Sequence, residues 1–175
     1  MTPEHRPATR LDVSHLSAID VHVHLEHAGS QVEADQAAAK YFKASGDRDW
    51  SALAAYYRSR RMGCVVFTVD EKLTGRPQVP NEAVLQFAAE NADIAMAFVS
   101  VDPNRGADAV KEARRLIAAG GVRGLKLHPP VQQFSPNDRL AYPLYEVFAE
   151  ARLPVLFTRV TAALAPTCAA AAASD

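Results

Sequence analysis

The sequence is poor in cysteine, in long apolar runs and in clustered charge of one sign. Cys64 and Cys168 lie far apart without a Cys-x-x-Cys spacing, which excludes a disulfide framework and a structural zinc knuckle. The 19 basic and 20 acidic residues give a formal net charge of −1 and no basic surface for nucleic acid. Met1–Asp20 lacks a signal-peptide core, and the longest uncharged run, Val160–Ser174, is shorter than the roughly 20 residues of a bilayer span. We therefore expect a cytoplasmic protein that has no nucleic-acid or membrane partner.

The composition, 49% hydrophobic over 175 residues, is that of one globular domain. Strand patterns and helix patterns alternate along the sequence. The expected strands are Ala18–His24, Cys64–Val69, Ile94–Val101, Val122–Leu127 and Leu153–Phe157. The expected helices are Asp49–Arg61, Asn81–Asn91 with Asn81 as its N-cap, Ala107–Ala119 ended by Gly120 and Gly121, and Asp138–Arg152.

This alternation predicts parallel strands joined by helical crossovers. An open doubly wound sheet and a (β/α)8 barrel both fit, but the first strand is not followed by a Gly-x-Gly-x-x-Gly turn, which favours the barrel. A complete barrel needs about 250 residues and eight strands. The prediction is therefore an α/β fold of the (β/α)8 TIM-barrel type with only about the first five strands present. The polar segment 26–47 is expected to be a partly helical insertion after the first strand.

The first strand ends in two histidines that alternate with apolar residues. Alternation predicts that Asp20, His22 and His24 share one face, while Val21 and the apolar residues after it face the covering helices. Two imidazoles at the carboxyl end of a barrel strand can bind one divalent metal. The alternative is a pair of solvated or hydrogen-bonded histidines.

The fourth strand ends in a lysine and a histidine that share a face. Lys126 would point into the barrel, where an unpaired ammonium is costly unless it has a function, and Pro129 ends the strand just beyond His128. The alternative is a salt-bridged lysine and a capping histidine at a surface turn.

The segments IDVHVHLE, GLKLHPP and LYEVFAEARLPVLF resemble the amidohydrolase superfamily. The closest branch is the amidohydrolase-related group of metal-dependent decarboxylases and hydrolases of aromatic-degradation intermediates. The resemblance implies a divalent metal, usually zinc, held by His22 and His24 and completed by a histidine from strand five and an aspartate from strand eight. It further implies that a metal-activated water acts on a small carboxylated or acyl substrate.

The resemblance also suggests roles for residues outside the metal site. Lys126 falls on the strand where dinuclear relatives carry a carbamylated lysine. In the single-metal branch, Lys126 and His128 would instead hold an anionic substrate or developing negative charge. Lys72 and Arg76 are weaker candidates for binding a substrate carboxylate, and a solvated loop is the alternative for them.

The sequence departs from the resemblance after Phe157, where the family commonly continues LPVLFHTG and this chain reads LPVLFTRV; no histidine follows His128. One permitted back-translation of residues 158–175, with a single C inserted before it, reads HTGHSGIGTDMRGGGGIR. This restores the histidine and a glycine-rich continuation. We therefore expect residues 1–157 to be the N-terminal part of a barrel and the Ala-rich tail 158–175 to be out of frame. Sequencing the gene across codons 155–175 tests this expectation.

Two functions remain open on these grounds. The first is a metal-dependent amidohydrolase-type hydrolase or decarboxylase for a small molecule. The second is an inactive truncated fragment that acts as an interaction module, using the strand edge near Leu153–Phe157 to pair with another chain, including a second copy of itself. A phosphate-binding barrel is disfavoured because Gly120 and Gly121 precede a strand and do not open a helix.

Overall fold

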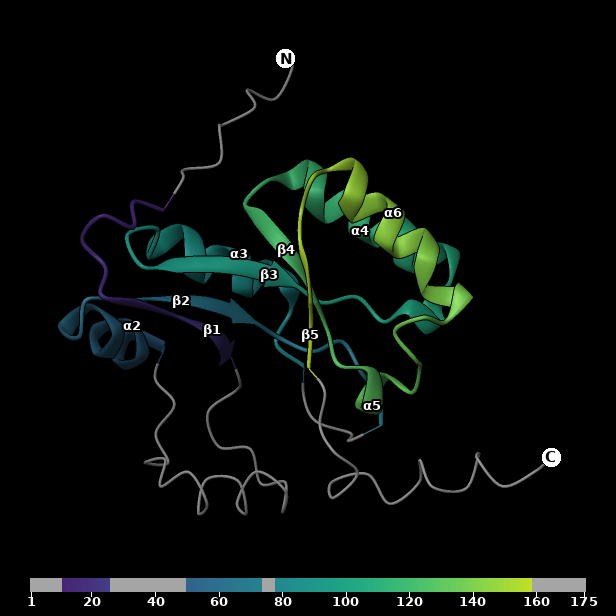
Figure 1. Ribbon diagram of the computed structural model, residues 1–175, viewed down its shortest axis with the longest axis horizontal. Helices are drawn as coiled ribbons and strands as arrows, with labels where there is room; N and C mark the ends of the chain where they lie inside the picture. The colour runs from purple at the N-terminus through teal and green to yellow at the C-terminus, as the bar shows by residue number, and fades with distance from the viewer. Residues whose placement is uncertain (1–10, 26–49, 74–77, 159–175) are drawn as a thin grey trace.

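The computed structural model describes residues 11–25, 50–73 and 78–158 of the chain (Figure 1). The strands are β1 (Ala18–His24), β2 (Met62–Phe67), β3 (Ala95–Val99), β4 (Val122–Leu127) and β5 (Val155–Phe157). The helices are α2 (Trp50–Ser59), α3 (Asn81–Glu90), α4 (Ala107–Ala119), α5 (Pro129–Gln132) and α6 (Tyr142–Glu150), with short 3-10 turns at Pro103–Arg105 and Arg139–Ala141. No helix in these three ranges has the length and apolar character needed to cross a membrane.

The five strands form one parallel sheet in the order β1-β2-β3-β4-β5. Every strand therefore pairs with its predecessor in the chain, as happens when successive crossovers proceed in one direction. A doubly wound sheet would instead reverse its strand order at a switch point. The sheet thus has the topology of the first five strands of a barrel, as predicted.

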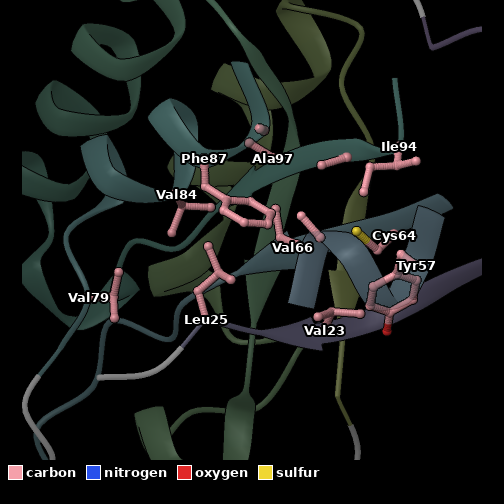
Figure 2. Packing of buried hydrophobic residues seen from close by; sticks show 13 residues of the cluster. Val23, Leu25, Tyr57, Cys64, Val66, Val79, Val84, Phe87, Ile94 and Ala97 are labelled. Atoms are coloured by element: carbon pink, nitrogen blue, oxygen red, sulfur yellow. The ribbon is translucent and has the colours of Figure 1, made fainter. Parts of the chain in front are cut away.

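Helices α2, α3, α4 and α6 pack on one face of this sheet through two hydrophobic clusters. The first joins β1, β2 and β3 to α2 and α3 (Figure 2), and the second joins β3, β4 and β5 to α4 and α6. In Figure 1, α4 and α6 lie side by side beyond β4. Central buried residues are Val66, Val84 and Phe87 in the first cluster, and Leu116, Leu125 and Phe148 in the second.

Two expectations about helix starts are wrong. Asn81 is the first residue of α3 and not its N-cap, because its side-chain amide is used elsewhere: it donates to the carbonyl of Ser100 and accepts from the Ser100 N–H, both at 2.8 Å. The helix expected from Asp138 begins at Tyr142 instead, after the 3-10 turn at Arg139–Ala141.

Glycines occupy the turn before β4 and one position inside the strand. Gly120 and Gly121 have φ of 88° and 83°, a left-handed conformation that lets the chain turn from α4 into β4, as predicted. Gly124 faces the side of the sheet away from the helices, where a Cβ atom would lie 2.4 Å from Cε2 of Phe98 on β3.

The predicted insertion at 26–47, and the predicted tail beyond Thr158, lie outside the described residues.

Candidate active site at the carboxyl end of the sheet

His22 and His24 lie side by side at the end of β1. Their Nε2 atoms are 3.1 Å apart, and their ring centroids are 5.1 Å apart. The ring of Phe67, at the end of β2, meets both imidazoles edge to face, with centroid separations of 5.2 Å to His22 and 4.8 Å to His24. The two Nε2 atoms are therefore close enough either to hydrogen-bond to each other or to bind one ion.

A β-bulge in β1, between Asp20 and Val23, contains the first histidine of this pair. Asp20 pairs with Cys64 and Val23 pairs with Val66, so three steps along β1 match two steps along β2. The extra residue interrupts the simple alternation of faces. As a result Val21, expected to face the helices, is 54% exposed, whereas Val23 is buried in the first hydrophobic cluster.

The bulge also directs Asp20 away from the histidines. Its Oδ2 accepts a 2.9 Å hydrogen bond from the hydroxyl of Tyr57 on α2, and its Oδ1 accepts a 2.9 Å hydrogen bond from the backbone N–H of His22. Asp20 therefore faces the helical layer. The prediction that it shares a face with His22 and His24 is wrong, because alternation fails across a bulge.

The side chain of Lys126, on β4, lies on the face of the sheet opposite the helices and has no exposed surface. Its ammonium sits 4.4 Å from the centroid of the Phe67 ring and donates a hydrogen bond to the hydroxyl of Thr158. No carboxylate within the described ranges forms an ion pair with it. Burial lowers the pKa of Lys126 to about 8.

His128 follows β4 and is only partly exposed. Its backbone N–H donates to Oε1 of Gln132 at 2.7 Å, whereas its Nδ1 is buried without a hydrogen-bond partner among the residues that the structure describes. Burial, followed by the charge of Lys126, lowers the pKa of both His128 and His22. Both shifts favour the neutral form of the imidazole.

Hydrogen bonds between loops hold the rim of the site. Gln132, after β4, donates through Nε2 to the carbonyl of Asp70, after β2, at 2.9 Å. The Asp70 N–H donates to Oγ of Ser100, after β3, at 3.0 Å. Oδ2 of Asp70 then accepts from the Asp102 N–H and from Arg105, each at 2.9 Å. Three successive strand ends are thus tied together.

Of the two predicted substrate-binding residues, the structure describes only one. Lys72 lies in the loop after β2 and is exposed, while Arg76 lies outside the described residues, so their expected substrate roles stay predictions. Sequence reasoning missed Phe67, Gln132 and the contact of Thr158. Strand alternation could have found Phe67, and Thr158 stands where the resemblance expects a histidine. No periodic signal identifies Gln132, which lies in the four-residue helix α5.

The histidine pair fits a divalent metal. Zinc–nitrogen bonds are about 2.0–2.1 Å, so two nitrogens 3.1 Å apart would subtend roughly 100° at a shared ion, near the tetrahedral angle. Within the described parts of the chain, no group of three or more His, Cys, Asp or Glu side chains converges on one point. Further ligands would therefore have to come from water, substrate or another part of the protein.

Comparisons with known proteins agree with this architecture. The sequence model of the amidohydrolase family matches residues 19–174. The fold is similar to that of an amidohydrolase II, with a TM-score of 0.59 and 13% identity over 86% of this chain and 53% of that one. It is also similar to an uncharacterised TIM-barrel protein from Bordetella bronchiseptica, with a TM-score of 0.60 and 16% identity over 79% of this chain and 54% of that one.

These likenesses confirm the predicted partial (β/α)8 barrel and, at such identities, concern the fold alone. The chain spans about half the length of the two solved structures. No curated protein matches it.

Proposed function

The chain belongs to the amidohydrolase family, and from this premise we propose that it serves metal-dependent hydrolysis or decarboxylation of a small carboxylated or acyl substrate. The observation that carries the proposal is the 3.1 Å approach of the Nε2 atoms of His22 and His24 at the carboxyl end of the sheet. Active sites of barrel enzymes lie at this end. The typical metal dependence of the family supports a divalent metal here, with zinc as the expected ion.

His22 and His24 are the proposed metal ligands, through their Nε2 atoms. The lowered pKa of His22 favours the neutral imidazole, which is the form that binds a metal. When bound, the metal supplies a Lewis acid and lowers the pKa of a coordinated water. Because protons compete for the same nitrogens, metal binding should weaken as the pH falls through the pKa of His22.

Lys126 and His128 are proposed to hold the anionic group of the substrate. A buried ammonium without a carboxylate in the described ranges is costly, and an anionic ligand would offset that cost. With a pKa of about 8, Lys126 is mainly protonated near pH 7. Nδ1 of His128, which has no hydrogen-bond partner within the described ranges, provides one further hydrogen-bonding position. Lys72 and Arg76 are proposed as additional contacts for a substrate carboxylate.

Apolar side chains exposed on β1 and β5, as far as the described residues extend, favour a second candidate, a non-catalytic interaction module. Ile19 and Val21 on β1 are 39% and 54% exposed, and Phe157 on β5 is 39% exposed. A second copy of the chain, or another protein, would cover these apolar residues. A stable dimer that binds no zinc would favour this candidate over the enzyme.

Zinc titration by calorimetry distinguishes the two. We expect about one Zn²⁺ per chain, and substitution of either histidine, His22→Ala or His24→Ala, should weaken binding by more than about tenfold. His15→Ala is the matched control, because His15 is an exposed histidine just before β1. Zinc affinity that survives both site substitutions would contradict the proposal.

A further inference from the structure

We propose that Asp20 and Tyr57 form a positioning pair for His22, holding it in the orientation that lets it share a metal ion with His24. The inference rests on the proposed function for the identity of the bound ion. The pair acts through the backbone of β1, because the Asp20 side chain faces the helical layer and Tyr57 lies in that layer.

The Asp20 carboxylate closes the bulge. Its Oδ1 accepts from the N–H of His22, two residues further along, at 2.9 Å. A carboxylate that bonds to the N–H two residues on is a recurrent way to stabilise a backbone turn. Within a bulge, it also satisfies an N–H where the strand ladder is disrupted. The bond therefore fixes the peptide from which the His22 side chain projects.

Tyr57 fixes the carboxylate in turn. Its side chain is 6% exposed and belongs to the first hydrophobic cluster, and its hydroxyl donates to Oδ2 of Asp20 at 2.9 Å. Figure 2 shows Tyr57 beside Val23, with its hydroxyl directed toward β1. Burial and the neighbouring Asp20 raise the pKa of Tyr57, so the phenol remains a donor at all ordinary pH values. A residue on α2 thus anchors the geometry of β1.

The bulge matters because it reconciles two requirements of β1. Val23 and Leu25 must face the core, where they are 7% and 2% exposed, while His22 and His24 must face the other side. A straight strand in register with β2 from Asp20 onward would shift these residues by one position, which exchanges the two faces. Loss of the bulge would therefore turn the histidines toward the helices or move the apolar residues out of the core.

Four substitutions separate this role from general stability. Asp20→Ala removes both acceptor oxygens, whereas Asp20→Asn keeps one oxygen able to accept from the His22 N–H. Tyr57→Phe removes only the hydroxyl and keeps the buried ring. Tyr56→Phe is the matched control, because it removes a hydroxyl from the adjacent tyrosine of the same helix, which is 50% exposed.

The first readout is hydrogen exchange of the His22 amide in the metal-free full chain. Loss of one hydrogen bond of ordinary strength should accelerate exchange by about tenfold in Asp20→Ala and by about threefold in Tyr57→Phe. Asp20→Asn should restore much of the protection that Asp20→Ala loses, and Tyr56→Phe should not differ from the unsubstituted chain. An unchanged His22 amide in both Asp20→Ala and Tyr57→Phe would overturn the inference.

The second readout is titration with Co²⁺ alone, followed by its visible absorption. Removal of groups that orient metal ligands typically weakens affinity by about 10–100-fold, and we expect this for Asp20→Ala, with a change of about fivefold for Tyr57→Phe. Unchanged Co²⁺ affinity and spectrum in both variants would overturn the metal-directed role. If the unsubstituted chain binds no Co²⁺, the proposed function is overturned, and amide exchange still decides whether the pair positions His22.

Discussion

Lys126 carries its amine in a position that is closed to solvent. Its Nζ atom lies 4.4 Å from the centroid of the Phe67 ring, and the Thr158 hydroxyl accepts one hydrogen bond from it. A cation–π contact and one hydrogen bond replace only part of the hydration of an ammonium, which has three donors. The folded chain therefore gives up stability to keep a cation at the carboxyl end of the sheet, a trade-off common at functional sites.

Replacing this amine should stabilise the protein. At pH 7 we expect the free energy of unfolding of Lys126→Met to be about 1–3 kcal/mol higher than that of the unsubstituted chain, because methionine fills a similar volume without a buried charge. Urea denaturation of both proteins measures the difference. Lys111→Met on the exposed surface of α4 is the control and should change little.

The same comparison has a defined pH dependence. The pKa of Lys126 is about 8 in the folded chain against an ordinary 10.5, so both states bind the proton below pH 8. Between these values the unfolded chain keeps a proton that the folded chain has released, and folding stability rises with pH across that window. The advantage of Lys126→Met should therefore shrink from pH 7 to pH 10. An advantage that stays constant with pH would contradict a lowered pKa.

Residue positions were predictable from sequence where a strand is regular. Alternation predicted that Lys126 and His128 share one face at β4, and the structure brings Lys126 to within interaction distance of Phe67 and Thr158. Alternation failed for Asp20, because the bulge that reorients it is accompanied by a hydrogen bond to Tyr57, 37 residues away. No local pattern encodes such a distant contact.

At the scale of elements, the Phe98 side chain of β3 packs over Gly124 of β4, which has no side chain. The Phe98 ring occupies the space that a Cβ atom at position 124 would fill, 2.4 Å from Cε2. Overpacking of this kind typically costs about 1–3 kcal/mol. We therefore expect Gly124→Ala to lower the free energy of unfolding by that amount, measured by urea denaturation.

A double-mutant cycle identifies the cause of that loss. In a Phe98→Leu background, where the aromatic ring is absent, Gly124→Ala should cost far less than in the unsubstituted chain. Equal costs in both backgrounds would show that the ring does not limit position 124.

Element boundaries were most predictable where local stop signals exist. Helix α4 and strand β4 have the expected limits because Gly120 and Gly121 end the helix in a left-handed turn. The start of α6 was misjudged because the residues from Asp138 carry a helical apolar pattern yet first form a 3-10 turn, with Pro143 in the first turn of the helix that follows.

For the whole molecule, the order of the strands was predictable because each strand–helix–strand unit constrains its neighbour. The segment 26–47 and the expected out-of-frame tail could not be settled in this way, because neither carries a strand–helix pattern, and both stay predictions. Thr158 is the last described residue, and its hydroxyl reaches Lys126. Position 158 therefore lies beside the cluster formed by Lys126, Phe67 and the two histidines.

A histidine at this position should strengthen metal binding. We expect Thr158→His to raise Zn²⁺ affinity by about tenfold or more, because a third imidazole would reach the ion from the residue that follows β5. Phe157→His is the control, since Phe157 faces the other way and meets Tyr145 of α6 at 5.9 Å between ring centroids. Calorimetric titration compares the two, and equal affinities in both variants would contradict the placement of position 158.

The sequential strand order also decides which part of the site opens first. Among the described residues, β1 and β5 each have one neighbouring strand, and β5 has only three residues. Strands with few hydrogen-bonded neighbours fray at lower free energy than the interior of a sheet. His22 and His24 lie on one of these margins and Thr158 just beyond the other, while Lys126 lies on β4, which has two neighbours. Brief local opening would thus separate the imidazoles from the ammonium long before the sheet itself unfolds.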